Sequence, residues 1–169
     1  MPTAFIALGS NIEPETHLAA AVRLLAEHVR ITGTSPVYRT PPWGVTEQAP
    51  FLNAVLWVET ALEPEPLLDL LLDLERRRKR VRTVRNGPRT LDLDLLSYED
   101  RVLETERLTL PHPRLHERAF VLVPLCDLAP DWRHPVLRRT AAQLLAAVDR
   151  AGIERSDFVL PILCGANGL

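Results

Sequence analysis

The sequence contains few of the residues on which several classes of protein depend. Its two cysteines, Cys126 and Cys164, form no CxxC pair and are too few for a disulfide framework. Cys126 lies in the apolar run FVLVPLCDLAP, so we expect it to be buried packing. No basic-then-apolar leader opens the chain, and no apolar run approaches the ~20 residues that a membrane span requires. These absences predict a protein of the reducing cytoplasm that does not engage membranes.

Two further absences restrict how the chain could bind nucleotides or nucleic acids. The sequence has no GxxxxGK[ST] motif, so it lacks the backbone cradle of a P-loop. Aromatic residues make up only 5%, and no predicted strand carries the exposed aromatic signature of RNA-binding modules. Any phosphate site must therefore be built from side chains, and we expect no nucleic-acid partner.

Positive charge is concentrated in one short segment. Acidic residues are absent between Arg76 and Arg89, where eight basic residues lie. The rest of the chain holds 12 basic and 22 acidic residues, although the formal net charge is only −2. A compact basic segment on an acidic body suits a small polyanion, such as the phosphates of a nucleotide, better than a long nucleic acid.

Hydrophobic periodicity predicts the order strand, helix, strand, strand, helix, strand. These elements are expected at 3–8, 15–29, 31–38, 51–60, 65–79 and 90–98. This split βαβ pattern is typical of a ferredoxin-like α+β fold, an antiparallel sheet with helices packed on one face. A hairpin arm near 102–110 and helices at 119–128 and 141–148 should follow, with Thr140 as the last N-cap. Without repeats or linkers, residues 1–169 are expected to form one domain.

The segment TLDLDLL places two carboxylates side by side. Asp92 and Asp94 alternate with leucines, so in a strand they share one face with Cα atoms ~7 Å apart. Two nearby anions repel each other, and Mg²⁺ shared with substrate phosphates is a natural counter-charge. Two alternatives stay open at this point: a merely solvated sheet face, and ion pairs with Arg82, Arg85 and Arg89.

Arginine forks could hold the phosphates from the opposite side. A second basic cluster, RLTLPHPRLHERAF, supports such a clamp, although each member could also be an ordinary surface residue. A flat acceptor is suggested by Asn53, which is disfavoured inside a strand and could read the edge of a heterocycle while Phe51 stacks on it. Capping of loose backbone groups by Asn53 is an equally acceptable explanation.

Taken together, the segments YRTPPWG, FLNAVLWVET, RVRTVRNGPRTLDLDLL and RLTLPHPRLHERAFVLVPL resemble the 6-hydroxymethyl-7,8-dihydropterin pyrophosphokinase family of folate biosynthesis. The resemblance implies a ferredoxin-like core and transfer of the pyrophosphoryl group of ATP to the pterin hydroxymethyl group, with release of AMP. It also implies small-molecule substrates only, and we expect a monomer.

The resemblance further implies residue roles. Asp92 and Asp94 would ligate two Mg²⁺ ions that bridge ATP and the attacking hydroxyl, with Arg82 and Arg89 as further catalytic residues. The residues around the nucleotide would be Glu75, Arg80, Arg82, Arg89, Arg107, Thr109, His112 and Arg118. The pterin pocket would consist of Thr40, Pro41, Trp43, Phe51, Asn53 and Phe120.

Some positions depart from the family pattern, namely Asn86, Leu72 and Pro113, and these affect the loop and the adenine contacts rather than the metal site.

Two other functions remain compatible with a ferredoxin-like fold: a palm-type nucleotidyl transferase or cyclase, and an RNA-binding module. The first would release pyrophosphate instead of AMP, and a gel-shift assay would reveal the second.

Overall fold

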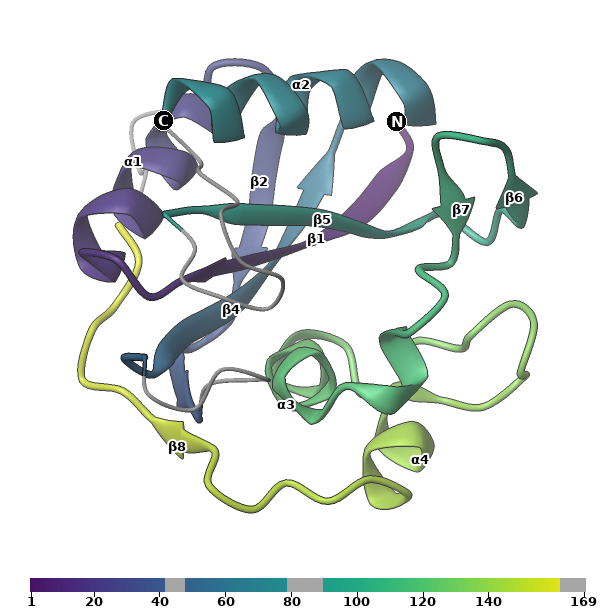
Figure 1. The fold of residues 1–169 in the computed structure, drawn as a ribbon. Helices are drawn as coiled ribbons and strands as arrows, with labels where there is room; N and C mark the ends of the chain where they lie inside the picture. Colours follow the sequence, from purple (N-terminus) through teal and green to yellow (C-terminus); the bar gives the residue numbers. More distant parts are fainter. Residues whose placement is uncertain (42–47, 79–89, 162–169) are drawn as a thin grey trace.

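The computed structural model describes residues 1–41, 48–78 and 90–161, and its elements follow the predicted order (Figure 1). The N-terminal half contains β1 (Thr3–Ser10), α1 (Pro14–Leu25), β2 (Arg30–Thr34), β3 (Tyr38–Thr40), β4 (Phe51–Glu59) and α2 (Pro64–Arg77). The C-terminal half contains β5 (Asp92–Tyr98), β6 (Leu103–Glu104), β7 (Thr109–Leu110), the 3₁₀ helix η1 (Leu115–Glu117), α3 (Ala119–Leu128), α4 (Ala141–Ala146) and β8 (Glu154–Arg155).

The strands form an antiparallel sheet in the order β5-β1-β4-β3-β8, and β2 also pairs with β4. This is the strand order of a ferredoxin-like fold, with β1 and β4 at the centre, and it confirms the predicted α+β class. The predicted arm is present as the small β6-β7 hairpin beside the main sheet (Figure 1).

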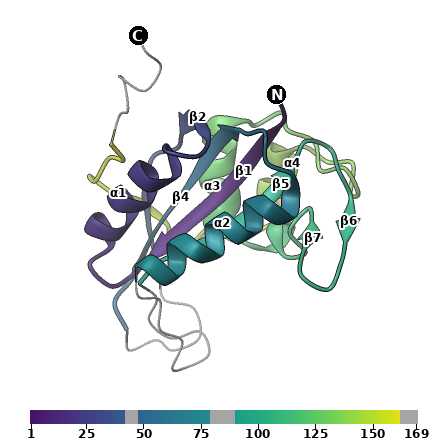
Figure 2. The ribbon, with the colours of Figure 1, turned by 90° about the horizontal axis from the view of Figure 1, so that it is seen from above.

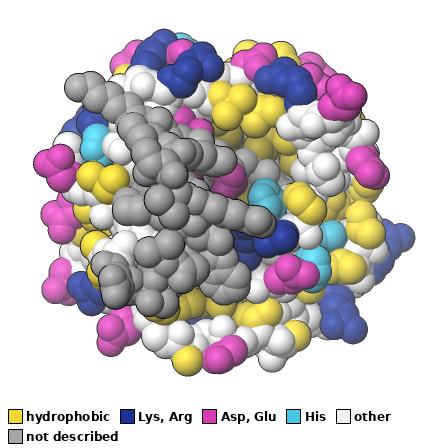
Figure 3. All heavy atoms as spheres, viewed as in Figure 1, with side chains coloured by type: hydrophobic (Ala, Val, Ile, Leu, Met, Phe, Trp, Pro, Cys, Tyr) yellow, Lys and Arg dark blue, Asp and Glu magenta, His cyan; other side chains and the backbone are white. Residues whose placement is uncertain are grey.

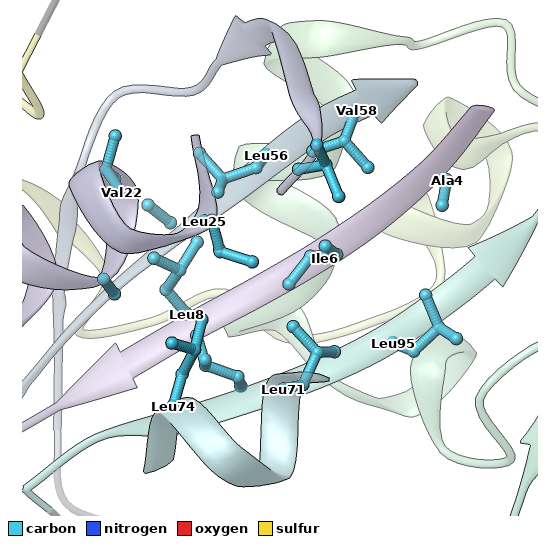
Figure 4. Close-up of a cluster of buried hydrophobic side chains, with 14 of the residues drawn as sticks. Ala4, Ile6, Leu8, Val22, Leu25, Leu56, Val58, Leu71, Leu74 and Leu95 are labelled. Carbon is cyan, nitrogen blue, oxygen red and sulfur yellow. The ribbon is translucent and has the colours of Figure 1, made fainter. Parts of the chain in front are cut away.

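One face of the sheet is covered by α1 and α2 (Figure 2). Alternate residues of β1 point to this side, where Ile6 and Leu8 are at most 1% exposed. They meet a leucine stripe of α2, which includes Leu71 and Leu74 (Figure 4). Period-2 strands packed against a helical stripe account for this core.

The opposite face is covered in part by α3 and α4, which differs from the expectation of helices on one face only. The physical reason lies in the other set of strand residues. Phe5, Val55 and Leu96 are also apolar, and Leu122 and Leu125 of α3 bury them. The sheet is therefore sandwiched between two helical layers along part of its length (Figure 2).

Three local predictions need correction. The strand expected at 31–38 is two strands, because Pro36 has no N–H and the Ser35 side chain instead accepts a hydrogen bond from Val55 N at 2.9 Å. The first helix ends at Leu25 rather than near residue 29. Cys126 is half-buried rather than fully buried, and burial raises the pKa of its thiol.

Other local predictions are confirmed. Helix α3 has the expected bounds. Thr140 caps α4 through a capping box in which its hydroxyl accepts from Gln143 N and Gln143 Oε1 accepts from Thr140 N. Within the described ranges, no helix has the length and apolar character needed to cross a membrane.

Candidate active site

The two aspartates lie at the start of β5, on the face of the sheet that α3 covers further along. Asp94 is paired with Ala7 and Asp92 with Gly9 of β1. Leu96, two residues after Asp94 on the same face, packs in the second core, whereas both aspartates are only half-buried. The alternating residues Leu93 and Leu95 are 3% exposed in the first core. The predicted placement of both carboxylates on one face is thus confirmed, and burial of the leucines fixes it.

Glu75 connects the last turn of α2 to the same strand. Its side chain is 5% exposed, and its Oε2 accepts a hydrogen bond of 2.7 Å from Leu93 N, the backbone group between the two aspartates. The structure therefore brings this predicted nucleotide residue next to the carboxylate pair. In the described structure its visible role is to hold α2 against β5.

Asn53 lies two strands away from the aspartates, in the same row across the sheet. Gly9 is the Cα partner both of Asn53 on β4 and of Asp92 on β5, so the three residues form a continuous row. Asn53 is 8% exposed, and its Nδ2 donates to Thr40 Oγ1 at 2.8 Å. Thr40 is in turn the cross-strand partner of Phe51, which is half-buried. Pro41 follows Thr40 and is exposed.

The segment from β7 to α3 places His112 against β5. Its backbone N–H donates to Leu96 O at 2.8 Å, and its Nδ1 accepts from Arg114 N at 3.1 Å. Burial, helped by the Arg118 and Arg114 charges, lowers the pKa of His112 to about 4. The imidazole is therefore neutral at pH 7 and carries its proton on Nε2. It is suited to donate one hydrogen bond, and it is not a cation.

Arg118 and Phe120 are adjacent in space as well as in sequence. The Arg118 guanidinium carbon lies 5.6 Å from the centroid of the Phe120 ring, in the cation–π range. Thr109 is half-buried in the short strand β7. Figure 3 shows acidic side chains, a histidine and basic side chains exposed next to one another near the centre of this face.

Arg107 lies beside α2 and not beside the two aspartates. It forms ion pairs with two acids in the first half of α2, with Glu65 at 3.4 Å and with Asp69. Asp69 lies six residues before Glu75, which is ~9 Å along the helix axis. The structure thus places Arg107 along α2, away from the carboxylate pair, and its predicted nucleotide contact stays a prediction.

Four predicted site residues fall outside the described residues: Trp43, Arg80, Arg82 and Arg89. The same holds for the possible ion pairs between Arg82, Arg85 or Arg89 and the aspartates. These predictions therefore stay open.

Sequence reasoning missed two contributors. Gly9 makes the close approach between β1 and the Asn53 side chain possible, and a glycine inside a strand is the signal that could have indicated it. Asn11 donates from Nδ2 to Gln48 Oε1 at 2.8 Å and to Ala49 O at 2.9 Å. It thereby ties the turn after β1 to the segment that leads into β4.

The donor set can be tested for its fit to magnesium. Among the described residues, no group of three or more His, Cys, Asp or Glu side chains is arranged to hold a metal ion. The carboxylates of Asp92 and Asp94 supply hard oxygen ligands from one sheet face. Mg²⁺ is commonly held by one or two carboxylates, with phosphate oxygens and water completing its shell, so this pair fits.

An apolar hollow lies outside this region. It is lined by Phe5, Trp57, Trp132 and residues 128–131. None of the predicted site residues lines this hollow, so it is not part of the candidate site.

Comparison with known proteins decides the family. The profile of the 7,8-dihydro-6-hydroxymethylpterin-pyrophosphokinase (HPPK) family matches residues 5–130. The chain belongs to this family. It is similar to the 2-amino-4-hydroxy-6-hydroxymethyldihydropteridine pyrophosphokinase of Methylorubrum extorquens, with 46% identity over 93% of this chain and 100% of that protein. The corresponding Bacillus subtilis protein is 48% identical over 74% of this chain and 77% of its own length. HPPK membership makes the chain a pyrophosphokinase transferase that acts on a pterin with ATP as co-substrate.

Solved structures agree on the fold. A wild-type Plasmodium falciparum HPPK-DHPS crystal structure matches 86% of this chain with a TM-score of 0.67 at 16% identity. An HPPK-DHPS structure in complex with substrates matches 91% of it with a TM-score of 0.73 at 13% identity. The chain spans less than half of these two longer proteins, 44% and 46% respectively.

Proposed function

We propose that the row formed by Asn53, Gly9 and Asp92 is the floor of the active site, with the pterin at the Asn53 end and the ATP polyphosphate at the Asp92 end. One observation carries this proposal: two pairings through Gly9 align an amide and a carboxylate on one sheet face. Adjacent strands lie ~4.8 Å apart, so β4 and β5 are separated by about 10 Å. A bicyclic ring and the hydroxymethyl arm would lie between them.

At the ATP end, Asp92 and Asp94 would hold two Mg²⁺ ions, in keeping with the family resemblance. Held by these two carboxylates, the metal would supply positive charge that stabilises the phosphates and would activate the attacking hydroxyl. The described chain contributes rigidity to this end, because Glu75 fixes the backbone between the two carboxylates. His112 would donate a neutral Nε2–H to a phosphate oxygen, and Arg118 would add positive charge nearby.

At the pterin end, Thr40 and Asn53 would read the donor and acceptor groups along one edge of the ring. Thr40 Oγ1 already accepts from Asn53 Nδ2, so its own hydroxyl proton is left to point elsewhere. Phe51 and Phe120 would cover the two faces of the bicycle. Because Arg118 stacks on Phe120, the same element would contact both substrates.

The reaction would move the pyrophosphoryl group of ATP to the hydroxymethyl oxygen of 6-hydroxymethyl-7,8-dihydropterin and release AMP. Such chemistry relies mainly on positioning and charge stabilisation, so we assign no separate general base among the described residues. We further propose that the protein acts as a monomer in the cytoplasm and that residues 1–169 form one domain.

The test is a product assay with magnesium, ATP and the pterin. We expect AMP to appear only when the pterin is present, in amounts equal to the pyrophosphorylated product. Release of pyrophosphate instead would indicate attack on the α-phosphorus, as in a nucleotidyl transferase, and would overturn the proposal.

A further inference from the structure

Gly9 occupies the middle of the active-site row, where any larger residue would meet Asn53. A Cβ atom at position 9 would lie 2.7 Å from Asn53 Oδ1 and 3.7 Å from Asn53 Cγ. Contacts under 3.0 Å are essentially never made by real Cβ atoms. The Asn53 amide therefore fills the space that a side chain at position 9 would need.

The backbone does not require a glycine here. The positive-φ glycine in the described chain is Gly152, so Gly9 adopts a conformation that alanine accepts. The third nearest atom to an added Cβ is Leu52 O at 3.9 Å, an ordinary van der Waals distance. The absence of a side chain at position 9 therefore leaves room for the Asn53 amide, and the backbone of β1 does not require it.

The amide is held from two sides. Its Nδ2 donates to Thr40 Oγ1 at 2.8 Å, and its Oδ1 rests over Gly9. Rotating the amide away from position 9 would break or distort the Thr40 hydrogen bond. Because the Asn53 side chain is 8% exposed, it has little room to take up another orientation.

We propose that Gly9 is a specificity-determining positioning residue, which orients Asn53 so that its amide matches the donor–acceptor edge of the planar heterocyclic substrate. This inference rests on the proposed function, in which Asn53 reads that edge. Asn53 contributes two of the three atoms nearest to an added Cβ, and Asp92 contributes none of them. A side chain at position 9 should therefore disturb pterin binding far more than nucleotide binding.

The first experiment compares Gly9→Ala with wild type. We expect pterin binding by calorimetry to weaken about tenfold, because a buried amide loses a well-placed hydrogen bond. Binding of a non-hydrolysable ATP analogue with magnesium should stay within about twofold, and kcat should fall less than kcat/KM for the pterin. Equal losses for both ligands, or unchanged pterin binding, would overturn the inference.

Gly33→Ala is a matched control in the same sheet. Its added Cβ would lie 3.3 Å from Leu128 Cδ2 and 3.6 Å from Trp57 Cβ, so the Leu128 side chain can move aside and no proposed site residue is touched. This variant should bind both ligands as wild type does. A pterin-specific loss in this control as well would overturn the inference, because it would trace the effect to the sheet in general.

A double-mutant cycle separates the inference from the proposed function. Asn53→Ala removes the two Asn53 atoms nearest to an added Cβ, so Gly9→Ala should cause no further loss of pterin binding in that background. The double variant should fold even if Gly9→Ala alone does not. Additive losses, or failure to fold in both backgrounds, would overturn the role of Gly9 while leaving the function intact. Absence of pterin-dependent AMP from the wild type would instead overturn the function itself.

Discussion

Asp92 and Asp94 owe their position to their neighbours. Leu91, Leu93 and Leu95 alternate with them and are at most 3% exposed, so the strand is anchored by apolar burial on the α2 side. The carboxylates point to the other face and contribute little to that anchoring. Removing their charge should therefore lower the catalytic rate without destabilising the strand.

Asp94→Asn is the first prediction at this scale. The substitution keeps the size of the side chain but removes a charge that would bind metal, so kcat should fall at least about 10²-fold. Thermal unfolding should change little. Steady-state measurement of AMP release provides the rate, with Asp100→Asn, an exposed position just after β5, as the matched control. Near-normal turnover in Asp94→Asn would refute its assigned role.

His112 gives the second prediction, which concerns pH. Its pKa is about 4 in the folded protein and about 6.5 when unfolded, so the unfolded chain binds the proton more readily. Between these two values, the free energy of unfolding should decline as pH falls. For this group the loss should reach at most about 3 kcal/mol.

The measurement is urea unfolding of wild type and His112→Gln at several pH values from 7 to 4. The pKa values of His17 and His134 are also lowered in the folded state, and both proteins keep those contributions. The difference between the two curves therefore isolates His112, and it should shrink steadily below pH 6.5. Parallel curves would contradict the prediction.

At the scale of elements, the contact between α2 and β5 supports the backbone of the proposed site. Glu75 accepts from Leu93 N in a buried position where water cannot replace it. Loss of the acceptor leaves a buried N–H without that partner, which costs about 2 kcal/mol. Because this bond lies between the two aspartates, the same change should also disturb their spacing.

The third prediction follows from this contact. Glu75→Ala should lower the free energy of unfolding by about 2 kcal/mol, whereas Glu75→Gln, which keeps an oxygen acceptor, should lower it by clearly less. Denaturant titration of both variants measures the difference. Equal stability of the two would show that the hydrogen bond does not hold the elements together.

The types of most helices and strands were predictable from the sequence, because their buried residues recur at helical or strand spacing. The leucine stripe of α2 and the alternation around Asp92 each specify one face. The break at Pro36 and the early end of α1 were not predicted, because they depend on local turn geometry. At the break, the Ser35 hydroxyl takes the place of a backbone acceptor for Val55 N. The carboxylate pair was visible as a pattern. Gly9 was not recognised because the first strand was expected to end at residue 8, whereas β1 continues to Ser10, and because the partner of Gly9 on β4 depends on strand pairing.

At the scale of the whole molecule, one sheet separates two apolar cores. The first lies under α1 and α2, and the second lies under α3 and α4. Strands β1, β4 and β5 contribute residues to both cores, so a substitution that disturbs the packing of one core should also affect the other through the shared backbone. The polar row occupies the sheet face at the point where the second core ends, so α3 both stabilises the sheet and lies beside the proposed site.

The last prediction tests whether the two cores form one cooperative unit. Leu71 and Leu122 are both fully buried, one in each core, and truncating either to alanine should lower the free energy of unfolding by about 3 kcal/mol. Far-ultraviolet circular dichroism and tryptophan fluorescence should report the same single denaturant transition for wild type and both variants. Two of the three tryptophans, Trp57 and Trp132, pack against the second core, so much of the fluorescence signal reports on that layer. If Leu122→Ala shifted the fluorescence transition alone, α3 and α4 would unfold separately from the sheet and the one-domain expectation would be wrong.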